Sequence, residues 1–158
     1  MSEESKKERL ERELNELLQE LRVALPGVQV LFAFLLTVAF SQRFPGLTNL
    51  QRNVYFATFL MTAVTTVMFI APTSYHRIRW REHDKEKMLV TSTHLVIWGA
   101  VFLALAITGT VFLITDVMFG FGPAAIVAGA ITGLLAWFWF GLPLMRRLSE
   151  SSGRRTKR

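Results

Sequence analysis

The chain has 158 residues, which is enough for one ordinary domain and too few for two. Hydrophobic residues make up 51% of it, charged residues make up 19%, and the formal net charge is +6. A soluble domain with so many apolar residues would have too little polar surface to cover its core. The chain has no cysteine, which excludes disulfides, thiolate metal sites and lipidated cysteines.

The charged residues lie in separate clusters instead of recurring along helix faces, as they do in a soluble amphipathic helix. All 18 basic and 12 acidic residues fall within 1–26, 42–53, 76–88 and 145–158 or at Asp116. The uncharged stretches between them match or approach the roughly 20 residues that a helix needs to cross a bilayer. Alternating strands, which a membrane barrel would require, are absent. We therefore predict an all-α integral membrane bundle over residues 27–145, with transmembrane helices at about 27–44, 54–75, 89–115 and 117–145.

Residues 1–26 precede the first span and are predicted to form a charged amphipathic helix on the cytoplasmic side. Arg9 and Glu13 are one of several oppositely charged i,i+4 pairs in this segment. Two heptads are too few for an independent coiled coil, so the leucines are expected to face the membrane interface or the bundle. An oligomerisation handle is the alternative. Pro26 is expected to end the helix. The leucines follow the 4-3-4 spacing of a heptad seam: Leu10, Leu14, Leu17 and Leu21.

Turn-forming residues separate the predicted spans. Residues 44–47 (FPGL) form a turn, and Thr48-Asn49 provides a cap for the second helix. Pro72 either ends that helix or kinks its last turn. Asp116 is expected to close the third span, and the glycines and proline of residues 120–123 to loosen the turn before the fourth. Residues 146–158 are predicted to form a basic, disordered cytoplasmic tail.

Lys and Arg are distributed unevenly between the two sides of the membrane. The N-terminal segment, the second loop and the C-terminal tail carry 16 of the 18, and the first and third connections carry two. Because basic residues concentrate in cytoplasmic loops, we predict a multi-pass cell-membrane protein with both termini in the cytoplasm. The basic clusters are expected to attract anionic lipid. They do not share a groove with aromatic residues, which argues against nucleic-acid binding.

A stripe of threonines lies on one face of the second predicted helix. Hydroxyls in such helices usually bond back to their own backbone or across to a neighbouring helix, so packing is the first interpretation. The second is a polar pathway in which His94, near the cytoplasmic end of the third helix, takes part. The residues of this candidate pathway are Thr58, Thr62, Thr65, Thr66 and His94.

Small residues recur every fourth position on the third and fourth helices. On the fourth, Ala125, Gly129 and Gly133 follow this spacing, and the two glycines form a GxxxG pair. Small side chains let helix backbones approach closely in lipid. The stripe predicts a packing surface, either within one bundle or across a homo-oligomer.

No Asp, Glu, Lys or Arg lies in the stretches 27–41, 54–75, 89–115 and 117–144, which make up nearly all of the predicted spans. Ion-coupled carriers usually hold such a group at depth. His83-Asp84, in the charged second loop, has no third ligand on a rigid element and no enclosed pocket. We therefore expect no enzyme activity, metal site or cofactor.

Several segments resemble a known family: residues 14–31 with 40–44, and the short motifs 71–77 (APTSYHR), 83–86 (HDKE) and 113–116 (LITD). The family is an uncharacterised one of small four-span membrane proteins, mostly actinobacterial, with a domain of unknown function. The resemblance covers nearly the whole chain. It implies the four-span fold and brings the label sodium:proton antiporter, which members often carry, without naming catalytic residues.

Two functions remain open on the sequence. The first is an oligomeric ion or small-solute transport component, which the threonine stripe and the family label favour. The second is a non-transporting membrane scaffold or regulatory protein that acts through its cytoplasmic face, where most of the charged residues are predicted to lie. A water-accessible cavity at Thr62 or His94 would favour transport, and a dry bundle would favour the scaffold.

Overall fold

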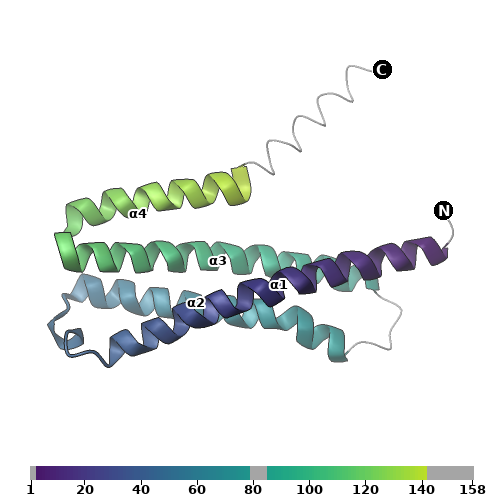
Figure 1. Ribbon diagram of the computed structural model, residues 1–158, viewed down its shortest axis with the longest axis horizontal. Coiled ribbons are helices and arrows are strands. Elements are labelled where there is room, and N and C mark those ends of the chain that lie inside the picture. Colours follow the sequence, from purple (N-terminus) through teal and green to yellow (C-terminus); the bar gives the residue numbers. More distant parts are fainter. Residues whose placement is uncertain (1–2, 79–84, 142–158) are drawn as a thin grey trace, which may run out of the picture. The chain divides into compact units, whose positions relative to one another are not determined.

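The computed structural model describes residues 3–78 and 85–141, and the side chains of residues 8–74, 89–139 and 141. Within that part of the chain the structure is helical, as Figure 1 shows. Four helices are long and apolar enough to cross a membrane, so the prediction of a four-span all-α membrane protein is confirmed. The elements are α1 (Glu3–Ala39), the 3₁₀ turn η1 (Phe44–Gly46), α2 (Asn49–Ile78), α3 (Lys85–Phe119), α4 (Phe121–Ala136) and the π-helix η2 (Trp137–Gly141).

The chain divides into two compact units, Met1–Ala106 and Ile107–Arg158, and the boundary falls inside α3. The first unit contains α1, α2 and the N-terminal part of α3. The second contains the C-terminal part of α3 with α4 and η2. Three predicted features lie outside the described residues: the His83-Asp84 pair, the last residues of the fourth span (142–145) and the basic tail (146–158).

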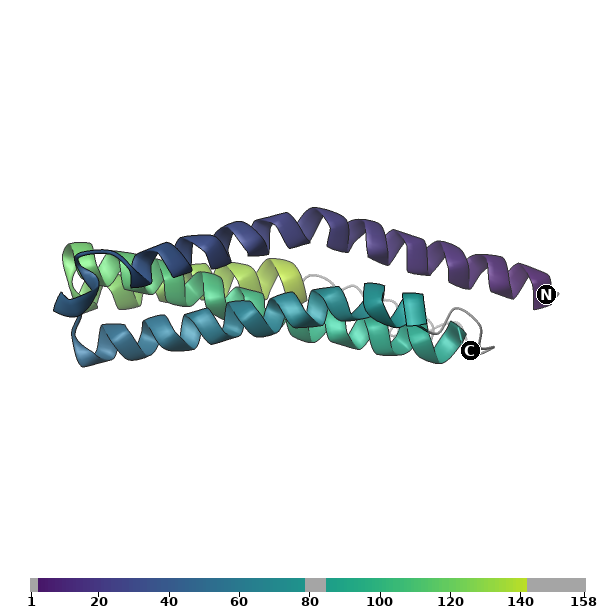
Figure 2. The ribbon, with the colours of Figure 1, turned by 90° about the horizontal axis from the view of Figure 1, so that it is seen from below.

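The N-terminal charged segment and the first span form one continuous helix of 37 residues, α1, about 55 Å long at 1.5 Å per residue. The prediction that Pro26 ends this helix is wrong. Pro26 is exposed, so its ring displaces no neighbouring element, and the missing N–H removes only the bond to the Arg22 carbonyl. Figure 2 shows α1 bent near its middle, as a proline inside a helix requires.

Burial along α1 follows a strict heptad that continues across the proline. The buried side chains recur every seventh residue, so Pro26 falls on the opposite, outward face. The heptad seam therefore extends from the charged segment through the membrane-spanning part. The buried positions are Leu14, Leu21, Val28 and Leu35.

The leucines of the charged segment pack against α2 and α3. Leu21 and Val28 form a core cluster with Phe69 of α2, and Val96 and Leu103 of α3 pack against it. Of the predicted alternatives, the structure thus shows the leucines facing the bundle. Figure 1 shows α1 crossing α2, which it contacts, and the two helices run in opposite directions.

The helices α2 and α3 also bury residues at heptad spacing, which is typical of left-handed membrane bundles with a small crossing angle. On α3 the buried positions in the first unit are small: Ser92, Gly99 and Ala106. On α2 the buried residues alternate in steps of three and four: Tyr55, Thr58, Thr62, Thr65, Phe69 and Pro72.

Hydrogen bonds between neighbouring residues cap the start of α2. A reciprocal pair of bonds caps its start: the Gln51 N–H donates to Thr48 Oγ1 at 3.2 Å, and the Thr48 N–H donates to Gln51 Oε1 at 3.0 Å. The predicted cap is therefore confirmed. Pro72 does not end the helix, because α2 continues to Ile78.

In the second unit a single glycine joins α3 to α4. Gly120 has φ 85° and ψ 175°, a conformation that side chains with a Cβ rarely adopt. Asp116 does not close the third span, because α3 continues for three more residues, to Phe119. The Gly120 N–H donates to the Asp116 carbonyl at 2.9 Å and completes the helix end.

Replacing Gly120 with alanine is expected to destabilise the protein by about 1–3 kcal/mol, because the residue must keep a backbone conformation open almost only to glycine. Unfolding in detergent, followed by circular dichroism, measures the change. Gly122→Ala is the matched control, since nothing lies within 4 Å of its added Cβ and its φ is not positive. Equal stability of the two variants would contradict the prediction.

Candidate functional site

The threonine stripe of α2 forms a buried column in the first unit. The exposed fractions of Thr58, Thr62 and Thr65 are 2%, 0% and 0%, and Thr66 is half-buried beside them. The heptad spacing of α2 places these side chains on the buried face of the helix. Threonine is β-branched and has few rotamers in a helix, so it loses little conformational freedom when it packs there. The first four residues of the candidate pathway therefore gather in one place.

The hydroxyls of the column bond to backbone carbonyls. Thr62 Oγ1 donates to the Thr58 carbonyl and Thr66 Oγ1 to the Thr62 carbonyl, both at 2.9 Å. Thr65 Oγ1 lies 2.9 Å from the Met61 carbonyl oxygen and 3.3 Å from that of Gly99, so it shares its proton between α2 and α3. The predicted bonding, mostly within the helix and in one case across to a neighbour, is confirmed.

Close approach of α2 and α3 depends on Gly99. A methyl group there would lie 2.5 Å from the Cε1 ring carbon of Phe69 and 3.3 Å from the Cβ of Met68. The absent side chain leaves room for the Phe69 ring and exposes the Gly99 carbonyl to Thr65. Gly99 was not among the predicted packing residues, although Ser92, Gly99 and Ala106 lie seven residues apart in the sequence.

Aromatic residues and one buried phenol join α1 to α2 at the other end of the first unit. Tyr55 Oη donates to the Leu35 carbonyl at 2.8 Å, although these residues are 20 positions apart. The Phe44 ring meets Tyr55 edge-on at 5.1 Å between centroids, and Phe32 stacks on Phe59 at 5.0 Å. These contacts fix the antiparallel register of α1 and α2.

The threonine column is dry in this conformation. Side chains with no accessible surface touch no space that a water molecule can occupy, which is the case for Thr62 and Thr65. Among the described residues, no buried side-chain nitrogen or oxygen lacks a hydrogen-bond partner. The column therefore needs no water to satisfy its polar groups.

His94 lies apart from the column. Its side chain is exposed on α3, and its Nδ1–H donates to the Val90 carbonyl at 2.8 Å. A residue two positions after the buried Ser92 points away from the seam. The structure thus does not bring His94 together with the threonines.

The small residues of α4 present two faces in the second unit. Ala124 and Ala128 are buried, and Thr132 Oγ1, which donates to the Ala128 carbonyl at 2.8 Å, lies 3.2 Å from Thr108 Oγ1 of α3. Ala125, Gly129 and Gly133 are exposed, one residue further along the helix. The contact within this unit is therefore not the predicted one. A role of the Ala125-Gly129-Gly133 stripe across a homo-oligomer stays a prediction.

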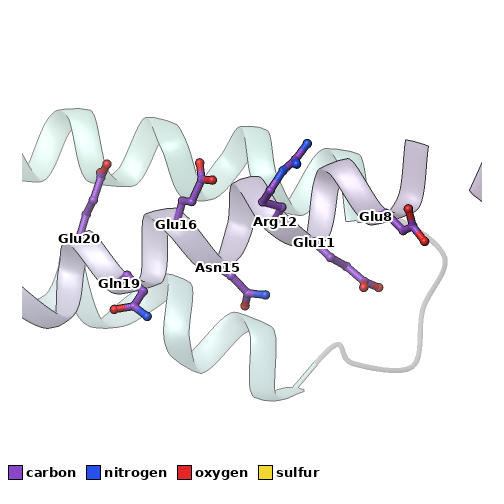
Figure 3. Close-up of a pocket in the computed structure, with 7 residues that line it drawn as sticks. All are labelled: Glu8, Glu11, Arg12, Asn15, Glu16, Gln19 and Glu20. Atoms are coloured by element: carbon purple, nitrogen blue, oxygen red, sulfur yellow. The ribbon is translucent and has the colours of Figure 1, made fainter. Parts of the chain in front are cut away.

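The N-terminal part of α1 carries an exposed polar surface, which Figure 3 shows in close-up. The predicted pair of Arg9 and Glu13 forms at 2.8 Å, and the bond to the carboxylate raises the pKa of the guanidinium above its ordinary value. We name the acidic surface by its residues: Glu8, Glu11, Arg12, Asn15, Glu16, Gln19 and Glu20.

Comparison with known proteins gives a family and no activity. The model of a family of unknown function (DUF6328) matches residues 3–143, which include the charged part of α1 and all four spans. No curated protein matches the chain, and no solved structure does.

Thr65→Val is expected to destabilise the protein by roughly 0.6 kcal/mol, the usual value of a hydroxyl bond between membrane helices. Valine keeps the branched shape and removes only the hydroxyl. Thr62→Val is the control, because the Thr62 bond stays within α2 and its loss should change stability less. Detergent unfolding compares the two, and a larger effect at Thr62 would refute the α2–α3 bond.

Gly99→Ala is expected to lower stability by about 1–3 kcal/mol through overpacking against Phe69. That loss exceeds the gain of up to about 1 kcal/mol that alanine brings to a helix. Adding Phe69→Leu makes room for the methyl group, so the double variant should be more stable than the two single changes predict together. Purely additive effects would contradict the close approach.

Proposed function

Because the chain belongs to a family of unknown function (DUF6328), its function must be inferred from its geometry, and we propose a non-transporting membrane scaffold. In this proposal the acidic surface of α1 binds a basic segment of a cytoplasmic partner protein. The observation that carries the proposal is that the acidic surface and a packed transmembrane span belong to one helix, α1.

The charge distribution supports a cytoplasmic position for the acidic surface. The segments that carry 16 of the 18 basic residues would all lie on the side of the N-terminus. The acidic surface itself has four carboxylates, one guanidinium and two amides. Such a surface attracts a basic partner and repels an acidic one, so it contributes mainly to specificity and to the rate of association.

The packing of the charged part of α1 supports an ordered, helical surface. Leu14, Leu17 and Leu21 hold this part against the bundle, so the acidic surface does not have to be ordered when a partner binds. The family match begins at residue 3 and includes this segment, which makes the acidic surface part of the matched domain.

Transport is the second candidate, and the buried threonine column is the observation that favours it. Its hydroxyls are spaced along α2 through the middle of a span. In the conformation described here the column is dry and its donors are bonded to carbonyls, which supports the scaffold. Conduction through it would require α2 and α3 to separate at Gly99.

Crosslinking from the acidic surface tests the scaffold. A photoreactive residue at Asn15 or Gln19 in native membranes is expected to capture a recurrent basic partner. Glu16→Gln with Glu20→Gln should weaken the capture by about two- to five-fold per charge, and added salt should weaken it further. Arg12→Gln is the control of opposite sign, because removing the cation makes the surface more acidic and should not reduce capture.

Two results would count against the scaffold. One is the absence of a recurrent partner, or a partner whose capture does not respond to these charges. The other comes from the purified protein in liposomes containing pH-sensitive and Na⁺-sensitive dyes. Flux above that of empty vesicles across imposed gradients would favour transport instead.

A further inference from the structure

The contacts between α1 and α2 define which residues lie opposite each other. Leu35 is opposite Tyr55, and Phe32 is opposite Phe59. In an antiparallel pair, each step back along α1 corresponds to a step forward along α2. Continuing this register places Arg22 opposite Met68, and the neighbouring residues Leu21 and Phe69 share a core cluster.

A proline follows four residues after each of these opposed positions. Pro26 has no N–H for the Arg22 carbonyl, and Pro72 has none for the Met68 carbonyl. Each pyrrolidine ring also pushes against the carbonyl four residues before it. The two carbonyls that lose their i+4 partner, those of Arg22 and Met68, therefore lie at one level of the bundle. Because the helices are antiparallel, the two proline rings lie on opposite sides of that level.

This level is where both helices leave their apolar spans. Arg22 is the last charged residue before the first span, and Thr73 and Ser74 directly follow Pro72. Pro26 is exposed on the face opposite the buried heptad positions, so the bend angle can change without moving the ring against the core cluster. The part of α1 before Pro26 is held by apolar contacts, which slide more readily than hydrogen bonds break.

We propose that Pro26 and Pro72 form a two-helix hinge, at which the charged part of α1 and the end of α2 tilt relative to their membrane-spanning parts. The register of the opposed residues, the paired prolines and the visible bend of α1 in Figure 2 carry the proposal. Only the role of the hinge rests on the proposed function: it would let a partner bound to the acidic surface change the tilt of the spanning helices. Its existence is testable without any partner.

Distances between spin labels test the hinge on the full chain in lipid nanodiscs. The chain has no cysteine, so Asn15→Cys with Thr37→Cys labels two exposed positions of α1 on either side of Pro26. They are 22 residues apart, which is about 33 Å in a straight helix. The hinge predicts a broad distance distribution with a mean below that length.

Pro26→Ala is expected to narrow the distribution and lengthen its mean, since it restores the N–H and removes the ring. Pro72→Ala should narrow it as well, because α2 then stiffens beside α1. Gly27→Ala is the matched control: it raises helix propensity next to the proline, nothing lies within 4 Å of its added Cβ, and it should leave the width unchanged.

A fixed kink gives a different result from a hinge. If Pro26→Ala lengthens the mean distance but leaves the width as it was, the bend is static and the hinge is overturned. A wild-type distribution as narrow as that of Pro26→Ala overturns it too. Circular dichroism and size-exclusion profiles of each variant verify that the helices remain folded, and a failed partner-capture experiment leaves these distances unaffected.

Discussion

The structure of the first unit depends on one spacing, the burial of every seventh residue on three neighbouring helices. In lipid no hydrophobic force drives helices together, so association relies on close packing and on a few hydrogen bonds. The heptad positions of α1 are large and apolar, half of those of α2 are threonine, and those of α3 in this unit are small. The sizes are complementary: Gly99 has no side chain where the Phe69 ring packs, and its carbonyl accepts a hydrogen bond from Thr65 Oγ1.

The absence of charge predicted the four spans well, because a charged side chain in hydrocarbon is too unfavourable to occur by chance. The threonine back-bonds and the cap at Thr48 were also predictable, since both depend on residues four or fewer positions apart. The prediction that Pro26 ends the helix was wrong because it considered only the helix-breaking propensity of proline and not the spacing of the buried residues around it. The spacing from Leu14 through Val28 to Leu35 crosses the proline and places it outward, where a helix tolerates it.

The face of α4 and the position of His94 could not be obtained in the same way. In the second unit α4 has small residues in two adjacent columns, and only contact with α3 decides that Ala124 and Ala128 are the buried ones. His94 and the threonines are all polar residues within spans, but they lie on different helices. The sequence does not show which face of each helix turns toward the other, so it could not show whether these residues meet.

The single-glycine connection between α3 and α4 has a consequence for how the protein can vary. A loop tolerates inserted residues when its backbone is exposed and its ends are not fixed by helix geometry. Gly120 fails this condition, because it completes the end of α3 through Asp116 and accepts the first bond of α4, from Ala124. Residues 40–48, with a separate 3₁₀ turn and an exposed arginine, meet it better. Length variation and topology reporters therefore belong in the first connection, while the α3–α4 turn behaves as a fixed-length joint.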